Sequence, residues 1–320
     1  MSILIYAESD NGKLKKTSFE LASYASKIAE SSQDEVVAVC VNADNVDALG
    51  NYGVHKVLNV KSEALAAFNA DMYADVLTQA ARETNSNLVV ISQSANAKYL
   101  AAALSINLEA GYASNVVALP DTSDGFKVKR TVFTNKAFGT AEITSAIKII
   151  GLANNAYGLT ENSVDCSVVD FSPAIAESGV EVKSVDKNTD KVSIADAEVV
   201  VSGGRGLKGP ENWHLIEDLA EVLGAATACS KPVSDMGWRS HGEHVGQTGK
   251  PVASNLYIAV GISGAIQHLA GINSSKTKVV INTDEEAPFF KAADYGIVGD
   301  AFEVVPQLIQ KLKDFKANNA

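Results

Sequence analysis

Short apolar runs alternate along the chain with longer stretches in which apolar residues recur every three or four positions. Short runs rich in Val and Ile are typical of buried strands, and the recurring spacing is typical of amphipathic helices. Strands that alternate with helices indicate an α/β fold built on a parallel sheet. In the first part of the chain we expect strands at 3–7, 35–41, 54–60 and 87–92 and helices at 17–30, 62–84 and 93–111.

This pattern changes near Asn115. Apolar runs at 115–119, 126–133 and 141–154 are separated by turn residues instead of helices, which predicts antiparallel strands added at one edge of the sheet. Farther along, residues 163–195 show only a weak alternation of apolar and polar positions and contain the polar stretch DKNTDK. Because polar, turn-rich stretches mark linkers, we place a domain boundary near Asp186. The two expected domains are residues 1–186 and 187–320.

The alternation of strands and helices resumes in the second domain. We expect strands at 197–202, 225–229, 256–260, 277–282 and 296–298 and helices at 211–223, 263–270 and 302–315. The expected fold class is therefore α/β, with two domains that each contain a mainly parallel sheet flanked by helices.

Three loops rich in Gly, Ser or Thr interrupt the second domain, with the sequences SGGRGLKG, GQTGK and GISG. Loops of this kind after parallel strands present backbone N–H groups to phosphate, and Arg205 or Lys208 could add positive charge. None of the loops is a signature by itself. The first resembles the dinucleotide-binding fingerprint only superficially and the second is not a Walker A motif, so each is also compatible with an ordinary tight turn.

Several polar side chains accompany these loops. Ser263 stands where a helix N-cap is expected, and His268 follows about one turn later, either as a core histidine or as a ligand in a shared cleft. Lys231 follows Ser230 at a strand end, where it is either a surface lysine or part of the cleft. The pair HxxH at 241–244 could bind a metal, but Gly242 argues against the helix that would align it, and we expect no metal site.

Composition narrows the possible functions. The formal net charge is −11, which argues against a nucleic-acid partner. Three scattered cysteines without a CxxC motif favour neither a disulfide framework nor an iron–sulfur cluster, and fit a reducing compartment. The chain begins without a basic, signal-like segment and contains no apolar run of ~18 residues, so we expect a cytoplasmic protein that does not span a membrane.

Longer motifs around the three loops resemble one known family, the alpha subunits of electron-transfer flavoproteins. They are SGGRGLKGPENW, VGQTGK, GISGAIQHLAGI and INTDEEAPFFKAADYGIVGDAFEVVPQL, which together cover most of residues 198–310. The opening segment ILIYAESDNGKLKK is also similar to the family, whereas residues 113–190 match it loosely.

The resemblance implies an electron carrier without its own substrate turnover. Such alpha subunits hold FAD in a C-terminal Rossmann-like domain and form a heterodimer with a beta subunit, which commonly binds AMP. The N-terminal domain would serve as part of the base for the FAD domain. The implied electron donors are acyl-CoA dehydrogenases of fatty acid beta-oxidation, and the implied acceptor is a membrane electron-transfer flavoprotein-quinone oxidoreductase.

The resemblance also implies roles for individual residues. Thr248 would bind flavin N5 with Gln247 beside it, and His268 would lie near flavin O2. Asp300 would bind the adenosine part of the cofactor. The residues expected to bind FAD are Arg205, Ser230, Lys231, Gln247, Thr248, Gly261, Ser263, Gly264, Gln267, His268, Asn282 and Asp300.

One position departs from the family pattern, because this chain has Ser230-Lys231 where the family usually has Ser-Arg. Lysine keeps the positive charge but loses the planar guanidinium that stacks on the flavin ring. Two other functions use the same glycine loops: a nucleotide-dependent oxidoreductase, which would need an acid–base pair, and a nucleotide-binding regulatory module.

Overall fold

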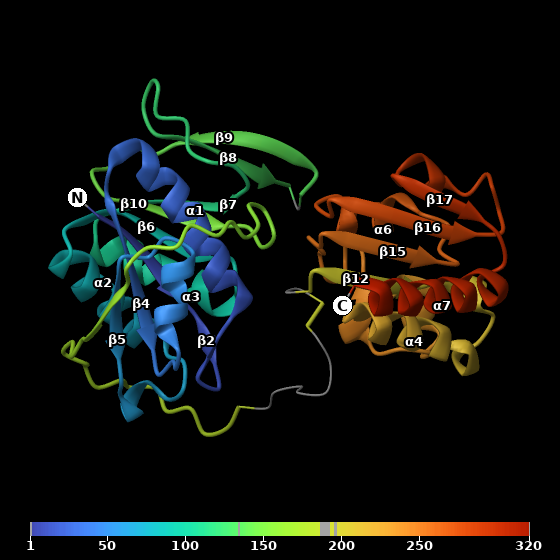
Figure 1. Ribbon diagram of the computed structural model, residues 1–320, viewed down its shortest axis with the longest axis horizontal. Coiled ribbons are helices and arrows are strands. Elements are labelled where there is room, and N and C mark those ends of the chain that lie inside the picture. Colours follow the sequence, from blue (N-terminus) through green and yellow to red (C-terminus); the bar gives the residue numbers. More distant parts are fainter. Residues whose placement is uncertain (1, 134, 186–192, 195–196, 320) are drawn as a thin grey trace. The chain divides into compact units, whose positions relative to one another are not determined.

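Two sheets organise the protein, one in each half of the chain (Figure 1). The computed structural model describes residues 2–133, 135–185, 193–194 and 197–319. It divides the chain into one unit formed by Met1–Val132 and Phe138–Val185 and another formed by Phe133–Ala137 and Asp186–Ala320. The boundary expected near Asp186 lies outside the described residues.

In the described part of the first unit, nine strands form one sheet in the order β11-β5-β4-β1-β6-β10-β7-β8-β9. Neighbouring strands from β11 to β7 pair in parallel, and β7 pairs with β8 in the antiparallel direction. The strands are β1 (Ser2–Ala7), β4 (Glu35–Val41), β5 (Lys56–Val60), β6 (Ser86–Ser92), β7 (Gly111–Val116), β8 (Lys127–Val132), β9 (Ala137–Glu142), β10 (Lys148–Leu152) and β11 (Ser167–Asp170). A separate small hairpin joins β2 (Ser9–Asp10) to β3 (Lys13–Leu14).

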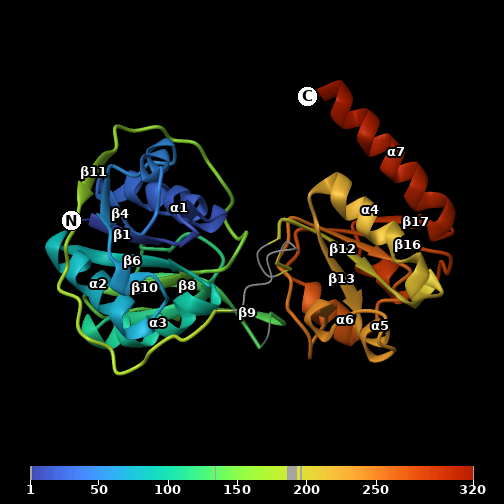
Figure 2. The ribbon, with the colours of Figure 1, turned by 90° about the horizontal axis from the view of Figure 1, so that it is seen from below.

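Helices cover both faces of this sheet. Helix α1 (Lys16–Ser32) lies on one face, and α2 (Ala70–Glu83) and α3 (Ala95–Asn107) lie on the other (Figure 2). Successive side chains of a strand point to opposite faces, so β1 sends Ile3 and Ile5 into one core and Leu4 into the other. All three are buried, which is why β1 has the continuous apolar sequence of a central parallel strand.

The structure corrects two expectations for this unit. The helix expected at 62–84 is interrupted, because the Asn69 side chain accepts hydrogen bonds from the N–H groups of Asp71 and Met72 and so starts α2 at Ala70. The segment 141–154, expected among the antiparallel edge strands, contains β10, which lies inside the sheet and pairs in parallel with β6 and β7. Its apolar run KIIGL is buried as in a central parallel strand.

In the second unit, the described residues form a parallel sheet of six strands in the order β14-β13-β12-β15-β16-β17. The strands are β12 (Val199–Gly203), β13 (Ala226–Ser230), β14 (His244–Val245), β15 (Leu256–Val260), β16 (Thr277–Asn282) and β17 (Tyr295–Val298). Helices α4 (His214–Leu223) and α7 (Ala301–Asn319) cover one face and α6 (Ile266–Ile272) covers the other (Figure 2), while the short α5 spans Lys231–Asp235.

Two local expectations for the second unit are wrong. Helix α6 begins at Ile266 after an Ala265 cap, so Ser263 is not its N-cap residue. The helix expected at 211–223 begins only at His214, because short 3-10 turns at Arg205–Leu207 and Pro210–Asn212 come before it. Among the described helices, none combines the length and the apolar character needed to cross a bilayer.

Candidate functional site

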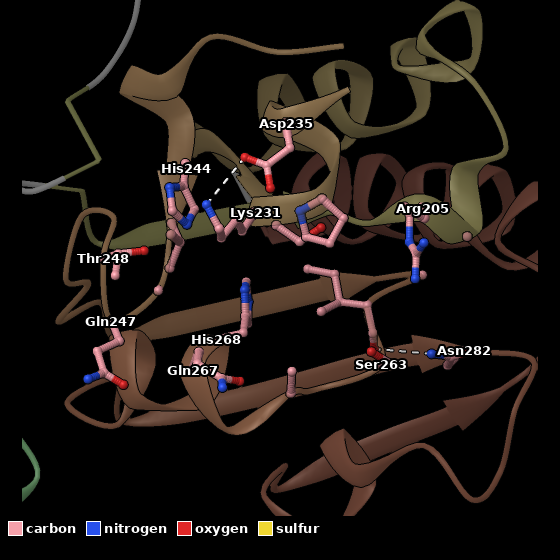
Figure 3. Close-up of a pocket in the computed structure, with 18 of the residues that line it drawn as sticks. Arg205, Lys231, Asp235, His244, Gln247, Thr248, Ser263, Gln267, His268 and Asn282 are labelled. Carbon is pink, nitrogen blue, oxygen red and sulfur yellow. Dashed lines mark hydrogen bonds and ion pairs between the residues drawn. The ribbon is translucent and has the colours of Figure 1, made fainter. Parts of the chain in front are cut away.

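The candidate site lies at the point where the order in which strands are added to the second sheet reverses. From β12 the chain adds β13 and β14 on one side, whereas β15, β16 and β17 follow on the other side. The helices that follow β12 and β15 therefore pack on opposite faces of the sheet, and open α/β sheets bind ligands at such a point. A cavity of about 630 Å³ opens at this edge (Figure 3). Its volume is in the range that accommodates an organic cofactor.

Glycines allow the two central loops to pack directly against each other. The Gly206 N–H donates to the Gly261 carbonyl oxygen at 3.0 Å. A Cβ atom at Gly204 would lie 2.1 Å from the same oxygen, and one at Gly206 would lie 2.7 Å from the Gly261 Cα. Gly261 also has a φ of +65°, in the left-handed region. Close packing of the loops is therefore the local reason why the sequence needs glycine here.

The structure brings most of the sequence-predicted residues together in this cavity. Those that line it are Arg205, Ser230, Lys231, Gln247, Thr248, Gly261, Ser263, Gln267, His268 and Asn282. They come from four strand ends, the GQTGK loop and the first turn of α6, although they are spread over a long stretch of sequence (Figure 3). Their binding of FAD stays a prediction.

Gly264 and Asp300 are the two candidates that do not line the cavity. Gly264 has a φ of +85°, and a Cβ atom there would lie 2.5 Å from the backbone nitrogen of Phe289. Asp300 accepts a hydrogen bond from the Phe302 N–H at 3.0 Å and lies 3.5 Å from the Lys208 ammonium. Gly264 therefore serves backbone packing and Asp300 starts α7, and a contact of either with FAD stays a prediction.

Three charged or titratable residues of the cavity were not among the candidates: Asp235, His244 and Asp284. Asp235 ends α5, and its Oδ1 atom lies 3.3 Å from the Lys231 Nζ atom. Proline near the start of a helical turn and the i,i+4 spacing of Lys and Asp were the signals that could have predicted this pair. His244 stood in the sequence only as half of a metal motif.

Asn282 anchors the edge of the cavity. Its amide nitrogen donates to the Ile262 carbonyl at 3.1 Å, and its amide oxygen accepts from the Asp284 N–H at 3.1 Å. The end of β16 thus holds the GISG loop in place beside the ligand-facing side chains. Because both the nitrogen and the oxygen of this amide already bind backbone groups, the main role of Asn282 is to support that loop.

His268 is an uncharged polar group in a largely apolar setting. It is 6% exposed, and its Nε2 atom lies 2.9 Å from the Tyr257 hydroxyl. Burial, reinforced by His244, lowers the pKa of His268 to about 4. Its Nδ1 atom is buried without a hydrogen-bond partner in the described chain. An orphaned buried nitrogen on a cavity wall is the kind of group that a polar ligand satisfies.

The pH dependence of stability follows from this histidine. Its pKa is about 4 in the folded protein against 6.5 for an unperturbed side chain, so the unfolded state binds the proton more readily. We expect the free energy of unfolding to fall by roughly 2–3 kcal/mol between about pH 7 and pH 4.5 from this group alone. Both tryptophans, Trp213 and Trp238, lie in the second unit and report its unfolding in urea.

The His268→Gln variant is the control for this prediction, because it removes the titrating group. Its unfolding free energy should depend on pH less steeply than that of the unchanged chain. Identical pH profiles for the two proteins would contradict a neutral, buried His268.

The cavity combines groups suited to a ligand with both phosphates and a polar ring. Arg205 and Lys231 supply positive charge and Ser230 and Ser263 supply hydroxyls, while Gln247, Thr248 and Gln267 supply further amide and hydroxyl groups. The neutral imidazole of His268 completes one wall. This set of donors fits a flavin dinucleotide.

Two protein-family models match the chain. The family model "Electron transfer flavoprotein domain" matches residues 3–188, and "Electron transfer flavoprotein FAD-binding domain" matches residues 193–273. The second match contains all three glycine loops.

Similar proteins named "Electron transfer flavoprotein subunit alpha" match nearly the whole chain. The protein of Syntrophomonas wolfei is 36% identical over 318 residues, covering 97% of this chain and 98% of its own. That of Bacillus subtilis is 34% identical over 330 residues, covering 99% of each chain. That of Thermoanaerobacterium thermosaccharolyticum is 35% identical over 328 residues, covering 98% of each.

Proposed function

This chain belongs to the electron transfer flavoprotein alpha-subunit family, and on that basis we propose that it binds FAD in the cavity of its second unit and carries electrons from acyl-CoA-type dehydrogenases to a membrane quinone oxidoreductase. The observation that carries this proposal is that the candidate residues converge between β12 and β15, where the strand order of the second sheet reverses. Family membership over the full length favours an electron carrier over a nucleotide-dependent oxidoreductase or a regulatory module.

Each part of the cavity has a separate task in this proposal. Arg205, Ser230 and Ser263 lie at the ends of neighbouring strands and would hold the phosphates. Thr248 and Gln247 on the GQTGK loop would donate to the polar edge of the ring, and Gln267 would bind the ribityl chain. Bound FAD supplies the redox chemistry, while these side chains orient it and exclude water.

Charge in the cavity would adjust how readily the flavin is reduced. Lys231 stands where the family usually has arginine, and its ammonium lies 3.3 Å from a carboxylate oxygen of Asp235. The carboxylate holds the flexible lysine chain in one orientation and partly offsets its charge. Lysine in this position therefore acts as a point charge rather than as a plane stacked on the ring.

The proposal also includes a beta subunit, with AMP bound in it, as the partner chain. Large apolar side chains that are exposed on the first unit support a partner surface there. Tyr99 and Ile106 on one side of α3 are 74% and 78% exposed, and Phe138 on β9 is 65% exposed. Apolar exposure of this kind is typical of surfaces that another chain covers.

The donor is tested by mixing the purified heterodimer with an acyl-CoA dehydrogenase and its acyl-CoA substrate without oxygen. We expect the flavin absorption of the heterodimer to bleach at catalytic amounts of dehydrogenase. No bleaching with any acyl-CoA dehydrogenase, in a heterodimer that dithionite does reduce, would contradict this class of donor.

The alanine variant of the exposed Tyr99 tests whether α3 contributes to the subunit contact.

A further inference from the structure

Tyr257 is a fully buried tyrosine on β15 whose hydroxyl reaches the cofactor cavity only through another side chain. Its hydroxyl lies 2.9 Å from Nε2 of His268. The Phe289 ring stacks on Tyr257 at 6.5 Å between centroids and 7° between planes, and it also packs against His268 at 6.1 Å. Phe289 is itself fully buried. These contacts hold both polar rings in a dry, fixed arrangement.

The neutral imidazole of His268 carries a single proton, on Nδ1 or on Nε2. Tyr257 is fully buried, and Nε2 of His268 is the hydrogen-bond partner that the described residues give its hydroxyl. A tyrosine hydroxyl has one proton, and leaving that proton without an acceptor in a buried site costs free energy. If Nε2–H donated to the tyrosine oxygen, the tyrosine proton would have no acceptor. The hydroxyl therefore donates to Nε2, and the imidazole proton belongs on Nδ1.

Ser202 does not offer the tyrosine proton another acceptor. Val200 pairs with Tyr257 across β12 and β15, so Ser202, two residues farther, projects from the same face of the sheet. Ser202 is fully buried, and its hydroxyl makes no hydrogen bond within the described residues. The tyrosine proton is therefore directed to Nε2 of His268.

We propose that Tyr257 is a positioning residue for the cofactor site. Its hydroxyl donates to Nε2 of His268, keeps the imidazole proton on Nδ1, and makes Nδ1–H the group that this histidine offers to a bound flavin. The buried Nδ1 has no hydrogen-bond partner within the described residues, so an acceptor atom of the ligand would receive the hydrogen bond from its N–H group. The role in cofactor binding rests on the proposed function, whereas the position of the proton does not.

The proton position is tested by long-range ¹H–¹⁵N NMR of the full chain labelled at its histidines, of which there are five. The His268→Gln variant identifies the His268 signal. We expect the neutral Nδ1–H form at neutral pH, and a shift to a mixture with the Nε2–H form in Tyr257→Phe, which keeps the ring that packs on Phe289. Tyr295→Phe, at an exposed position of the same unit, should change nothing.

An Nε2–H form in the unchanged chain, or the same form in Tyr257→Phe, would overturn the assignment. The second readout is the dissociation constant of FAD, which should rise about fivefold in Tyr257→Phe, the factor that follows from one weakened neutral hydrogen bond. Unchanged FAD affinity would overturn the link to the cofactor. Failure of the unchanged chain to bind FAD would instead count against the proposed function and leave the NMR result to decide the proton position.

Discussion

Replacing Gly261 by alanine is expected to abolish FAD binding. The new Cβ atom would lie 2.8 Å from the Cα of Gly206, a backbone atom that cannot move without displacing the first glycine loop. The φ of +65° adds strain of roughly 1–2 kcal/mol for a residue with a side chain. Both loops would hold the phosphates in the proposed complex, so we expect FAD affinity to fall by more than ~100-fold, as for misplacement of several polar contacts.

Gly224 provides a matched control for this prediction. It has the same φ of +65° at the end of α4, but nothing lies within 4 Å of its Cβ position. Gly224→Ala should therefore carry the strain without the clash and keep FAD. FAD content and tryptophan fluorescence are measured for both variants after the same purification. A Gly261→Ala protein that binds FAD as well as Gly224→Ala would contradict the account of the loops.

Changes at the Lys231–Asp235 pair should move the flavin reduction potential in opposite directions. Reduction adds negative charge to the ring, so a nearby positive charge favours it and a negative charge opposes it. We expect Lys231→Met to lower the potential and Asp235→Asn to raise it, each by about 30–60 mV for a one-electron step, the equivalent of roughly 1 kcal/mol at a partly screened site. Both side chains are more than a third exposed, which limits the effect.

The measurement is a reductive titration of the heterodimer against a dye of known potential. Lys231→Arg is the conservative control, because it keeps the charge and restores the planar group that the family usually has. Potentials that shift in the same direction in Lys231→Met and Asp235→Asn would show that charge at this pair does not govern the flavin. Increased ionic strength should reduce both shifts.

The alternation of apolar runs was sufficient to predict the α/β fold, but not the place of each strand. β10 was expected at an edge because its neighbours in sequence are separated by turns. After β8 and β9 the chain instead returns into the sheet, where β10 (KIIGL) pairs with β6 on one side and with β7 on the other. Insertion between two earlier strands depends on contacts distant in sequence, which local periodicity does not contain.

The prediction of helix starts was limited for the same reason, because it used only neighbouring residues in the sequence. Ser263 has the composition of an N-cap, yet its carbonyl accepts from the Phe289 N–H and α6 begins three residues later. The competing partner lies 26 residues away in sequence, since 289 − 263 = 26. A tertiary contact therefore decided a feature that the local sequence could only suggest.

In the site, the glycine loops and their polar tips were predictable, whereas the residues that support them were not. Tyr257 lies in LYIAV, which reads as an ordinary buried strand, and only the structure shows that its hydroxyl meets His268. Asp300 follows a strand end, as a ribose-binding acid would, but in the structure it starts α7. Spacing along the chain identifies which loops converge, and it does not show which polar side chains are used to hold them.

FAD binding by the second unit is best tested by the visible absorption spectrum of this chain purified with its partner subunit, followed by identification of the released cofactor. We predict the bands of an oxidised flavin, bleaching with dithionite, and FAD as the flavin released on denaturation, with loss of the bands in Gly261→Ala but not in Gly224→Ala. A folded complex that is colourless and stays colourless after incubation with FAD would contradict it.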